Sequence, residues 1–404
     1  MHRRHLLAGA AGAAALAALP TLGQTADAWG ASAGYPTGWG GGFEKGRTFR
    51  VGNYSGGYEQ MFKHRSIAAG ALVSPLTEAL RPDFKYRWGL FQRSPQDYLD
   101  QWPVTGLLIA RKGNIWHESY RHQRTAAMRL TSWSMAKSVT SLLLGICLDR
   151  RLIASYDDPA QRYLPELQGT LHGGVTLRHL SNMSSGAEVL HDRDNAVIYP
   201  AAFLGADTDI ARTVAGWNQR REDAGRSFNY NELCPLTIGM VIRRVTGQSL
   251  SEFAQTALWQ PMGAEAAATW LTDSRLNEFN CIGVGARLRD WARLGQLVAQ
   301  RGNMNGTQVV STAWIDECTR WSDSDKQVSY GSARQRPALL AGYKAFMWHA
   351  KADGSQPVFA GHHGQRVLVD LPTQTVVVQT GVDHEGAWQP ELHALFNAAA
   401  DMKT

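Results

Sequence analysis

A long apolar run behind two polar residues is the feature that most constrains the fold of this chain. Residues 132–150 read SWSMAKSVTSLLLGICLDR, and apolar side chains occupy most positions from Val139 to Leu148. A helix that is apolar on nearly all sides must be buried inside a core rather than lie on a surface. With 404 residues and 44% hydrophobic content, the chain can form such a core in two domains or in one composite domain.

Ser134 and Lys137 stand three residues apart at the start of this predicted helix. Residues at this spacing share a helix face, so the hydroxyl and the amine can come within hydrogen-bonding distance. The helix dipole and burial both disfavour an ammonium ion, so we expect Lys137 to be neutral enough to accept the serine proton. The Ser134 N–H would form half of an oxyanion hole. The same residues also fit an ordinary capped core helix, so the pair alone leaves both interpretations open.

The first 28 residues have the pattern of an export signal. Two arginines precede an alanine-rich apolar stretch over 6–19, and the small-residue sequence Ala26-Asp27-Ala28 follows it. The stretch is short for a membrane span, and the last three residues fit a signal-peptidase site. We therefore expect a signal peptide over 1–28 and a periplasmic or secreted protein with no membrane span after signal removal. The paired arginines leave both the Sec and the twin-arginine routes open.

Charge and cysteine usage exclude several classes of function. The net charge of +6 is spread along the chain instead of collected in runs, which argues against a nucleic-acid partner. Four cysteines in so long a chain make no disulfide framework, and no metal-site spacing is present. The adjacent His362 and His363 would point to opposite faces of a strand. We expect neither a metal nor a cofactor.

Strand patterns gather near both chain ends, whereas the middle is richer in helices. Residues 104–120 alternate around Lys112-Gly113 and predict a β-hairpin. Strands are also predicted at 341–349, 365–372 and 375–382, and helices at 235–247, 285–302 and about 388–400. These elements predict an α/β (α+β) fold, with an antiparallel sheet that both chain ends form and helices flank. The predicted units are a glycine-rich lead-in (29–49), an α/β domain (50–150 and 285–404) and an inserted, mostly helical domain (151–284).

Three further segments follow the Ser134-x-x-Lys137 motif in a specific order. They are TLRHLSNMSSG (176–186), FNYNE (228–232) and AGHHGQ (360–365). The ordered set resembles the serine hydrolases of the β-lactamase and penicillin-binding-protein superfamily, over a region from about Arg50 to the C-terminus. Within it, the chain is most similar to class C-like members, particularly the 6-aminohexanoate-dimer hydrolase group. The resemblance implies a β-lactamase/transpeptidase-like fold.

The resemblance also implies a role for each motif residue. Ser134 would be the acylated nucleophile and Lys137 its activating partner, while Tyr230 would carry a proton between them and the leaving group. Gly364 would let a strand approach the substrate closely. The Gln365 N–H would complete the oxyanion hole that the Ser134 N–H begins.

Two motif positions depart from the superfamily pattern and bear on the substrate. The chain has Tyr230-Asn231-Glu232 where many relatives have Tyr-x-Asn, and His362-His363-Gly364 where β-lactamases have Lys-Thr-Gly. We assign Glu232, His362, His363 and Gly364 to substrate binding. A carboxylate and mostly neutral histidines disfavour the carboxylate of penicillins and D-Ala-D-Ala peptides. The segment 187–199 lacks the acidic-aromatic run of the aminohexanoate group, which argues against nylon oligomers as well.

Three functions remain open from the sequence. The first is an exported serine hydrolase that cleaves an amide or ester bond of a small molecule through an acyl-enzyme on Ser134. The second is a β-lactamase or DD-peptidase that uses the same residues. The third is a non-catalytic, penicillin-recognising binding or sensor protein. The presence of both Lys137 and Tyr230 favours an enzyme, because a binding module needs neither.

Overall fold

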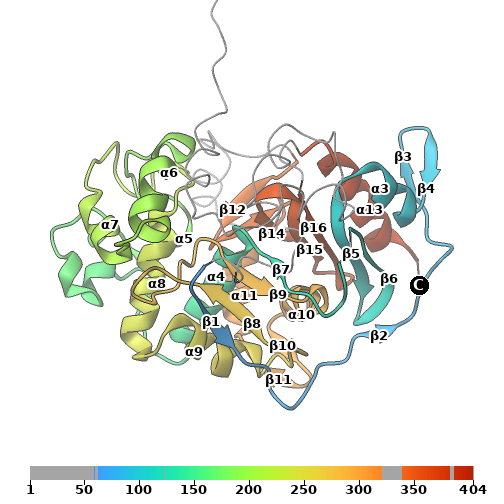
Figure 1. Ribbon diagram of the computed structural model, residues 1–404, viewed down its shortest axis with the longest axis horizontal. Helices are drawn as coiled ribbons and strands as arrows, with labels where there is room; N and C mark the ends of the chain where they lie inside the picture. The colour runs from blue at the N-terminus through green and yellow to red at the C-terminus, as the bar shows by residue number, and fades with distance from the viewer. Residues whose placement is uncertain (1–58, 60–61, 123, 321–338, 383–385, 404) are drawn as a thin grey trace, which may run out of the picture.

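The computed structural model describes residues 59, 62–122, 124–320, 339–382 and 386–403 (Figure 1). The predicted signal peptide (1–28) and glycine-rich lead-in (29–49) lie outside these residues. Within the described ranges, no helix is both long enough and apolar enough to cross a membrane.

The main sheet has eight strands, and both ends of the chain contribute to it. The order across the sheet is β12-β13-β14-β15-β16-β5-β6-β2. The strand bounds in that order are Gly342–Lys344, Met347–His349, Pro357–Gly361, Gln365–Asp370, Thr375–Gly381, Val104–Arg111, Asn114–Tyr120 and Thr77–Glu78. All neighbours are antiparallel except β2 and β6, which are parallel. The predicted sheet from both chain ends is therefore confirmed.

Helices cover both faces of this sheet (Figure 1). Helix α10 (Leu288–Ala299) packs so closely that a Cβ atom on Gly295 would lie 2.6 Å from Val376 Cγ1. Successive strand residues point to opposite faces, so Gln379 of β16 faces away from α10. There it accepts a hydrogen bond of 2.6 Å from the Tyr98 hydroxyl of α3 (Pro95–Gln101). Helix α13 (Gln389–Asp401) contacts α3 and lies on that same face.

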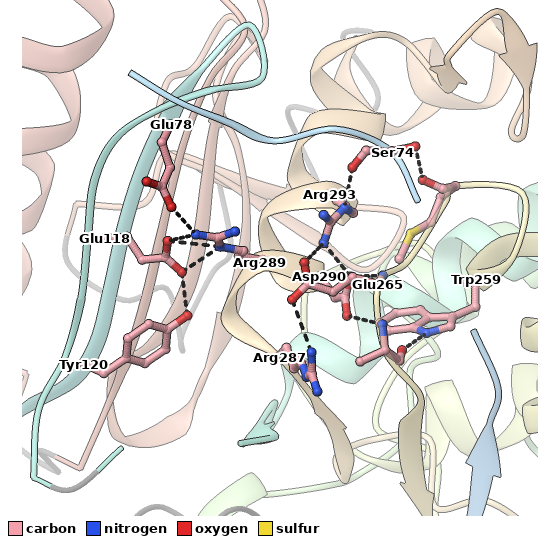
Figure 2. Close-up of polar contacts among 12 residues, drawn as sticks. Ser74, Glu78, Glu118, Tyr120, Trp259, Glu265, Arg287, Arg289, Asp290 and Arg293 are labelled. Atoms are coloured by element: carbon pink, nitrogen blue, oxygen red, sulfur yellow. Dashed lines mark hydrogen bonds and ion pairs between the residues drawn. The ribbon is translucent and has the colours of Figure 1, made fainter. Parts of the chain in front are cut away.

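A cluster of charged side chains fastens α10 to the edge of the sheet (Figure 2). Arg289 of α10 donates to Glu118 of β6 at 2.7 Å and to Glu78 of β2 at 2.9 Å. One turn further on, the buried Arg293 donates to Asp290 at 2.8 Å and to the Ser74 carbonyl at 2.9 Å. Because Arg293 and Asp290 are buried, water screens this pair less than it screens exposed ion pairs.

The middle of the chain is rich in short helices and also contributes to a second, smaller sheet. This sheet has the order β1-β8-β9-β7, with bounds His64–Ile67, Ala268–Leu271, Val284–Ala286 and Leu130–Thr131. The helices of the middle region are α5 (Leu177–Ser181), α6 (His191–Tyr199), α7 (Ile210–Gly216), α8 (Leu233–Thr246) and α9 (Leu250–Ala254). Short 3₁₀ and π turns accompany them at Ala160–Arg162, Pro165–Leu167, Pro200–Leu204 and Gln255–Trp259. Strand β8 was not predicted, and the division into two domains stays a prediction.

The long apolar run forms helix α4 (Met135–Asp149), which is buried over nearly its whole length. It packs against α8, against strand β14 and against Trp314 of α11 (Thr312–Thr319). A Cβ atom on Gly145 would lie 2.2 Å from Trp314 Cδ1, so only glycine permits this approach. The start of α4 is thereby fixed between the large sheet and the helices of the middle region.

Most predicted elements are confirmed, with two local corrections. The hairpin at 104–120 is β5–β6, the helix at 235–247 is α8, and the last helix is α13. The helix predicted at 285–302 begins only at Leu288, because Val284–Ala286 pairs with β7 and β8. The segment 341–349 forms two strands joined by a turn at Ala345 and Phe346, both in the left-handed region. Two further hairpins, β3–β4 (Tyr86–Trp88, Phe91–Arg93) and β10–β11 (Asn303–Met304, Thr307–Gln308), complete the fold.

We expect Gly145→Ala to lower the free energy of unfolding by about 1–3 kcal/mol, because the added methyl group collides with Trp314. This loss runs against the ordinary helix preference, which favours alanine over glycine by about 1 kcal/mol. Urea denaturation measures the change. Gly216→Ala in α7 is the matched control, since nothing lies within 4 Å of its added Cβ atom. Equal stability of Gly145→Ala and the wild type would contradict this packing.

Candidate active site

The backbone leading into α4 places Ser134 at the start of the helix. The Ser132 N–H donates to the Val284 carbonyl at 2.8 Å, and the Val284 N–H donates to Ser132 Oγ at 3.0 Å. Trp133 then adopts a φ of 44°, a left-handed conformation that bulky residues rarely take. Such strain gathers at functional sites, where the surrounding structure holds it. Ser134 follows as the N-cap of α4 and is half-buried.

Lys137 lies one turn into α4 and contacts the nucleophile candidate directly. Its Nζ atom donates to Ser134 Oγ at 3.0 Å and to the Cys281 carbonyl at 3.1 Å. The same atom lies 2.6 Å from Glu232 Oε2, and both side chains are only 1% exposed. The pairing of Ser134 with Lys137 that the sequence predicts is therefore present, with a buried carboxylate beside it.

The segment 230–232 reaches the site from the start of a second helix. Glu232 is the N-cap residue of α8, so the N-termini of α4 and α8 converge on Lys137. Tyr230 is half-buried and has its ring centroid 4.8 Å from Lys137 Nζ. It also stacks on Trp348 of β13, with a centroid distance of 5.8 Å. The structure thus brings Ser134, Lys137 and Tyr230 together from distant parts of the chain.

The proton states of these groups follow from burial and from one another. Burial acts to lower the pKa of Lys137, but the adjacent Glu232 carboxylate outweighs it and holds that pKa above its usual value. Burial acts to raise the pKa of Glu232. Lys137 and His191 outweigh this effect and hold the pKa of Glu232 well below its usual range. Burial raises the pKa of Tyr230, partly opposed by Lys137. The paired carboxylate therefore opposes the expected neutral form of Lys137, because Glu232 compensates for the helix dipole and the loss of water.

The third motif forms a turn rather than part of a strand. Residues His362–Gly364 make a 3₁₀ turn between β14 and β15, in which His362 is exposed and His363 is buried. Both imidazole rings lie beside Trp133, at centroid distances of 5.5 and 5.2 Å. The turn therefore lies next to the residue that precedes Ser134.

Two glycines flank the histidines of this motif and have different structural roles. A Cβ atom on Gly361 would lie 2.2 Å from the Ser132 carbonyl oxygen, whereas one on Gly364 would meet nothing closer than 3.3 Å. Gly364 is needed for its φ of 92° instead. The contact at Gly361 was not predicted, whereas the close approach of Gly364 to a substrate stays a prediction.

Gln365 is hydrogen-bonded within the same turn, and its place in the oxyanion hole stays a prediction. Its backbone N–H donates to the His362 carbonyl inside the turn, which leaves it poorly placed to bind a substrate oxyanion. Its side-chain Nε2 donates to the carbonyls of His362, His363 and Gly381, at 2.8 to 3.1 Å. The side chain of Gln365 thus stabilises the turn through these three hydrogen bonds.

Sequence reasoning missed two side chains that contact Glu232. His191 Nε2 lies 3.4 Å from Glu232 Oε1, and the Tyr199 hydroxyl donates to the same oxygen at 3.3 Å. Both come from α6, and no periodicity or spacing links α6 to Glu232 along the chain. The carboxylate of Glu232 faces these residues and Lys137, so its burial does not favour the predicted contact with substrate.

No metal site accompanies these groups in the part of the chain that the structure describes, where no three His, Cys, Asp or Glu residues are placed to hold an ion. The four cysteines are buried and form no disulfide. The side chains that meet at the start of α4 are a hydroxyl, an amine and a phenol.

Comparisons with known proteins agree with this arrangement. The family model described as Beta-lactamase matches residues 95–386, which is more than half of the chain. The 6-aminohexanoate-dimer hydrolase of Paenarthrobacter ureafaciens is 25% identical over 300 residues, which cover 70% of this chain and 73% of that protein. The chain therefore belongs to the β-lactamase family, as the ordered motifs predict, and is a serine hydrolase of this family.

Solved structures show the same fold at low sequence identity. A Bacillus anthracis protein described as a 6-aminohexanoate-dimer hydrolase superimposes with a TM-score of 0.71 at 22% identity, covering 84% of this chain and 90% of that one. A family VIII carboxylesterase gives a TM-score of 0.58 at 17% identity, covering 75% and 94%. The predicted β-lactamase/transpeptidase-like fold is confirmed.

We expect Lys137→Met to lower the free energy of unfolding at neutral pH by about 3–5 kcal/mol, because it leaves the Glu232 carboxylate buried and unpaired. In the wild type the pKa of Glu232 is lower in the folded than in the unfolded state, so the pair stabilises the fold above the ordinary glutamate pKa and loses this effect on acidification. In the variant, acid neutralises the unpaired carboxylate. The stability difference should therefore shrink between pH 7 and about pH 4 in urea denaturation.

Arg244→Met is the matched control for that experiment, because Arg244 pairs with Glu166 at 2.7 Å on the surface. An exposed pair contributes about 0–1 kcal/mol, so this variant should differ little from the wild type at either pH. A Lys137→Met variant as stable as the wild type at neutral pH would contradict the buried ion pair.

Proposed function

We propose that the protein hydrolyses an amide or ester bond of a small molecule through an acyl-enzyme on Ser134. The observation that carries this proposal is the 3.0 Å contact between Lys137 Nζ and Ser134 Oγ at the start of a buried helix. A serine hydroxyl is a weak nucleophile unless a base accepts its proton, and an amine at this distance can do so in its neutral form.

In the proposed acylation step, neutral Lys137 accepts the proton of Ser134 while Oγ bonds to the substrate carbonyl carbon. The carbonyl electron pair moves onto oxygen and gives a tetrahedral oxyanion. As the oxyanion collapses, the bond to the leaving group breaks and Tyr230 donates a proton to it. Tyr230 then regains a proton from Lys137, whose Nζ lies 4.8 Å from the centre of the Tyr230 ring. The acyl group remains on Ser134.

We propose that the oxyanion lies between the start of α4 and the turn after β14. The Ser134 N–H, at the positive end of the α4 dipole, supplies one donor. Gly361, which precedes that turn, packs against the carbonyl of Ser132, two residues before Ser134. We propose that a backbone N–H of the turn supplies the second donor.

Deacylation reverses these roles with water as the nucleophile. A water molecule loses a proton to the Lys137–Tyr230 pair while its oxygen bonds to the acyl carbon, and Ser134 Oγ leaves and is protonated again. The products are a carboxylic acid and the free enzyme. No cofactor enters this cycle.

The substrate proposal rests on the groups that the turn offers. His362 is exposed beside Trp133, and histidine is mostly neutral at pH 7, so the site lacks the lysine that meets a β-lactam carboxylate. The relatives named above are a 6-aminohexanoate-dimer hydrolase and a carboxylesterase. We therefore favour an uncharged amide or ester over penicillins. Export through the signal predicted at 1–28 remains part of the proposal.

Covalent labelling tests the nucleophile. We expect intact-mass analysis after treatment with a fluorophosphonate to show one adduct on the folded protein, and none on Ser134→Ala. Ser138→Ala is the matched control, because Ser138 is buried and donates to the Phe346 carbonyl. Folded wild-type protein that takes no adduct would overturn the proposed function.

Substitution of Tyr230 tests its proposed role as the proton donor to the leaving group. Tyr230→Phe keeps the ring stacked on Trp348 but removes the hydroxyl, so we expect kcat for p-nitrophenyl esters to fall by about 10²–10⁴-fold with little change in KM. Tyr163→Phe, whose hydroxyl bonds to Asp158, is the control and should keep wild-type kcat. Nitrocefin measured alongside tests the substrate preference, because rapid turnover would favour a β-lactamase.

A further inference from the structure

The carboxylate of Glu232 is the least expected group beside the proposed base. It lies 2.6 Å from Lys137 Nζ, and neither side chain has meaningful contact with solvent. Without a partner, a buried lysine at a helix N-terminus gives up its proton readily, because burial and the helix dipole both act against the ammonium ion. A carboxylate at this distance reverses that preference.

Glu232 is itself held in its charged form by the fold. It is the N-cap residue of α8, where the helix dipole favours a negative charge. Its second oxygen, Oε1, meets His191 and the Tyr199 hydroxyl, so both carboxylate oxygens have partners. The position and the charge of Glu232 are therefore determined by α8 and α6, not by substrate.

We propose that Glu232 holds Lys137 as an ammonium ion in the resting enzyme and thereby sets an alkaline range of pH in which Ser134 becomes nucleophilic. This inference rests on the proposed function of Lys137 as the base. Glu232 is a positioning residue in this account, because it acts through Lys137 and touches no substrate. It also explains why a carboxylate can replace the neutral amide of the Tyr-x-Asn pattern without abolishing the site.

The other titratable groups around Lys137 and Glu232 do not hold Lys137 in its protonated form at alkaline pH. They are His191 and Tyr199 from α6, Tyr230, Cys234 of α8, Cys281 before β9 and Tyr343 of β12. Burial raises the pKa of each of the phenols and thiols, so they stay uncharged. An imidazole such as that of His191 carries charge mainly in acid. In the alkaline range, Glu232 is thus the dominant charge acting on Lys137.

The pH dependence of Ser134 labelling by a fluorophosphonate tests this inference. In the wild type, the labelling rate constant should still rise through about pH 10, the ordinary range of a lysine. Glu232→Gln leaves Lys137 buried without its carboxylate, so the midpoint should fall by about two pH units or more, and labelling at pH 7 should rise at least about tenfold. Glu232→Asp keeps the charge and should keep a midpoint near that of the wild type.

The matched control is Glu166→Gln, which removes a carboxylate from the surface pair with Arg244 and should leave the midpoint unchanged. The inference would be overturned if Glu232→Gln kept the wild-type midpoint of the labelling curve or was labelled more slowly at every pH. Labelling of Ser134 in that case would still support the proposed function. A wild-type rate that reaches its plateau below about pH 8 would also overturn it, whether or not the variant folds. If wild-type Ser134 takes no adduct at any pH, the proposed function itself fails.

Discussion

The burial of helix α4 is the constraint on which the rest of the structure depends. Its apolar side chains extend around the whole helix, so the core must enclose it on every side. The large sheet, α8 and α11 provide this enclosure, and Gly145 permits the closest contact, with Trp314. Because α4 cannot shift within such a tightly packed core, its first turn holds Ser134 and Lys137 in one fixed relation.

Two helix N-termini meet at that first turn, and their convergence explains the electrostatics of the site. The dipoles of α4 and α8 both favour negative charge, which suits an oxyanion and a carboxylate but not an ammonium ion. Glu232 lies at the start of α8 and balances Lys137. The same contact that stabilises the buried pair also opposes the loss of the Lys137 proton, so stability and basicity are coupled through one carboxylate.

Much of the fold was predictable, because local sequence patterns indicate several of its helices and strands and the ordered motifs indicate its family. The β5–β6 hairpin follows from alternation around Lys112-Gly113, and α8 from its early proline and from Gly247, which ends it in the left-handed region. Strand β8 was missed because Ala268–Leu271 is a short apolar segment, for which periodicity does not separate strand from helix. The start of α10 was misplaced because pairing with β7 and β8 overrides its helical pattern at Val284–Ala286.

The sequence by itself determined the nucleophile candidate, its lysine partner, the tyrosine segment and the family, because each rests on residue type and order along the chain. Only the tertiary structure decided which carboxylate lies beside Lys137 and which glycine of the turn packs against Ser132. Glu232 pairs with Lys137, and Gly361 lies against the Ser132 carbonyl, because α8 and the β14–β15 turn pack against the start of α4. Such contacts join residues more than 90 positions apart, where neither spacing nor periodicity carries information.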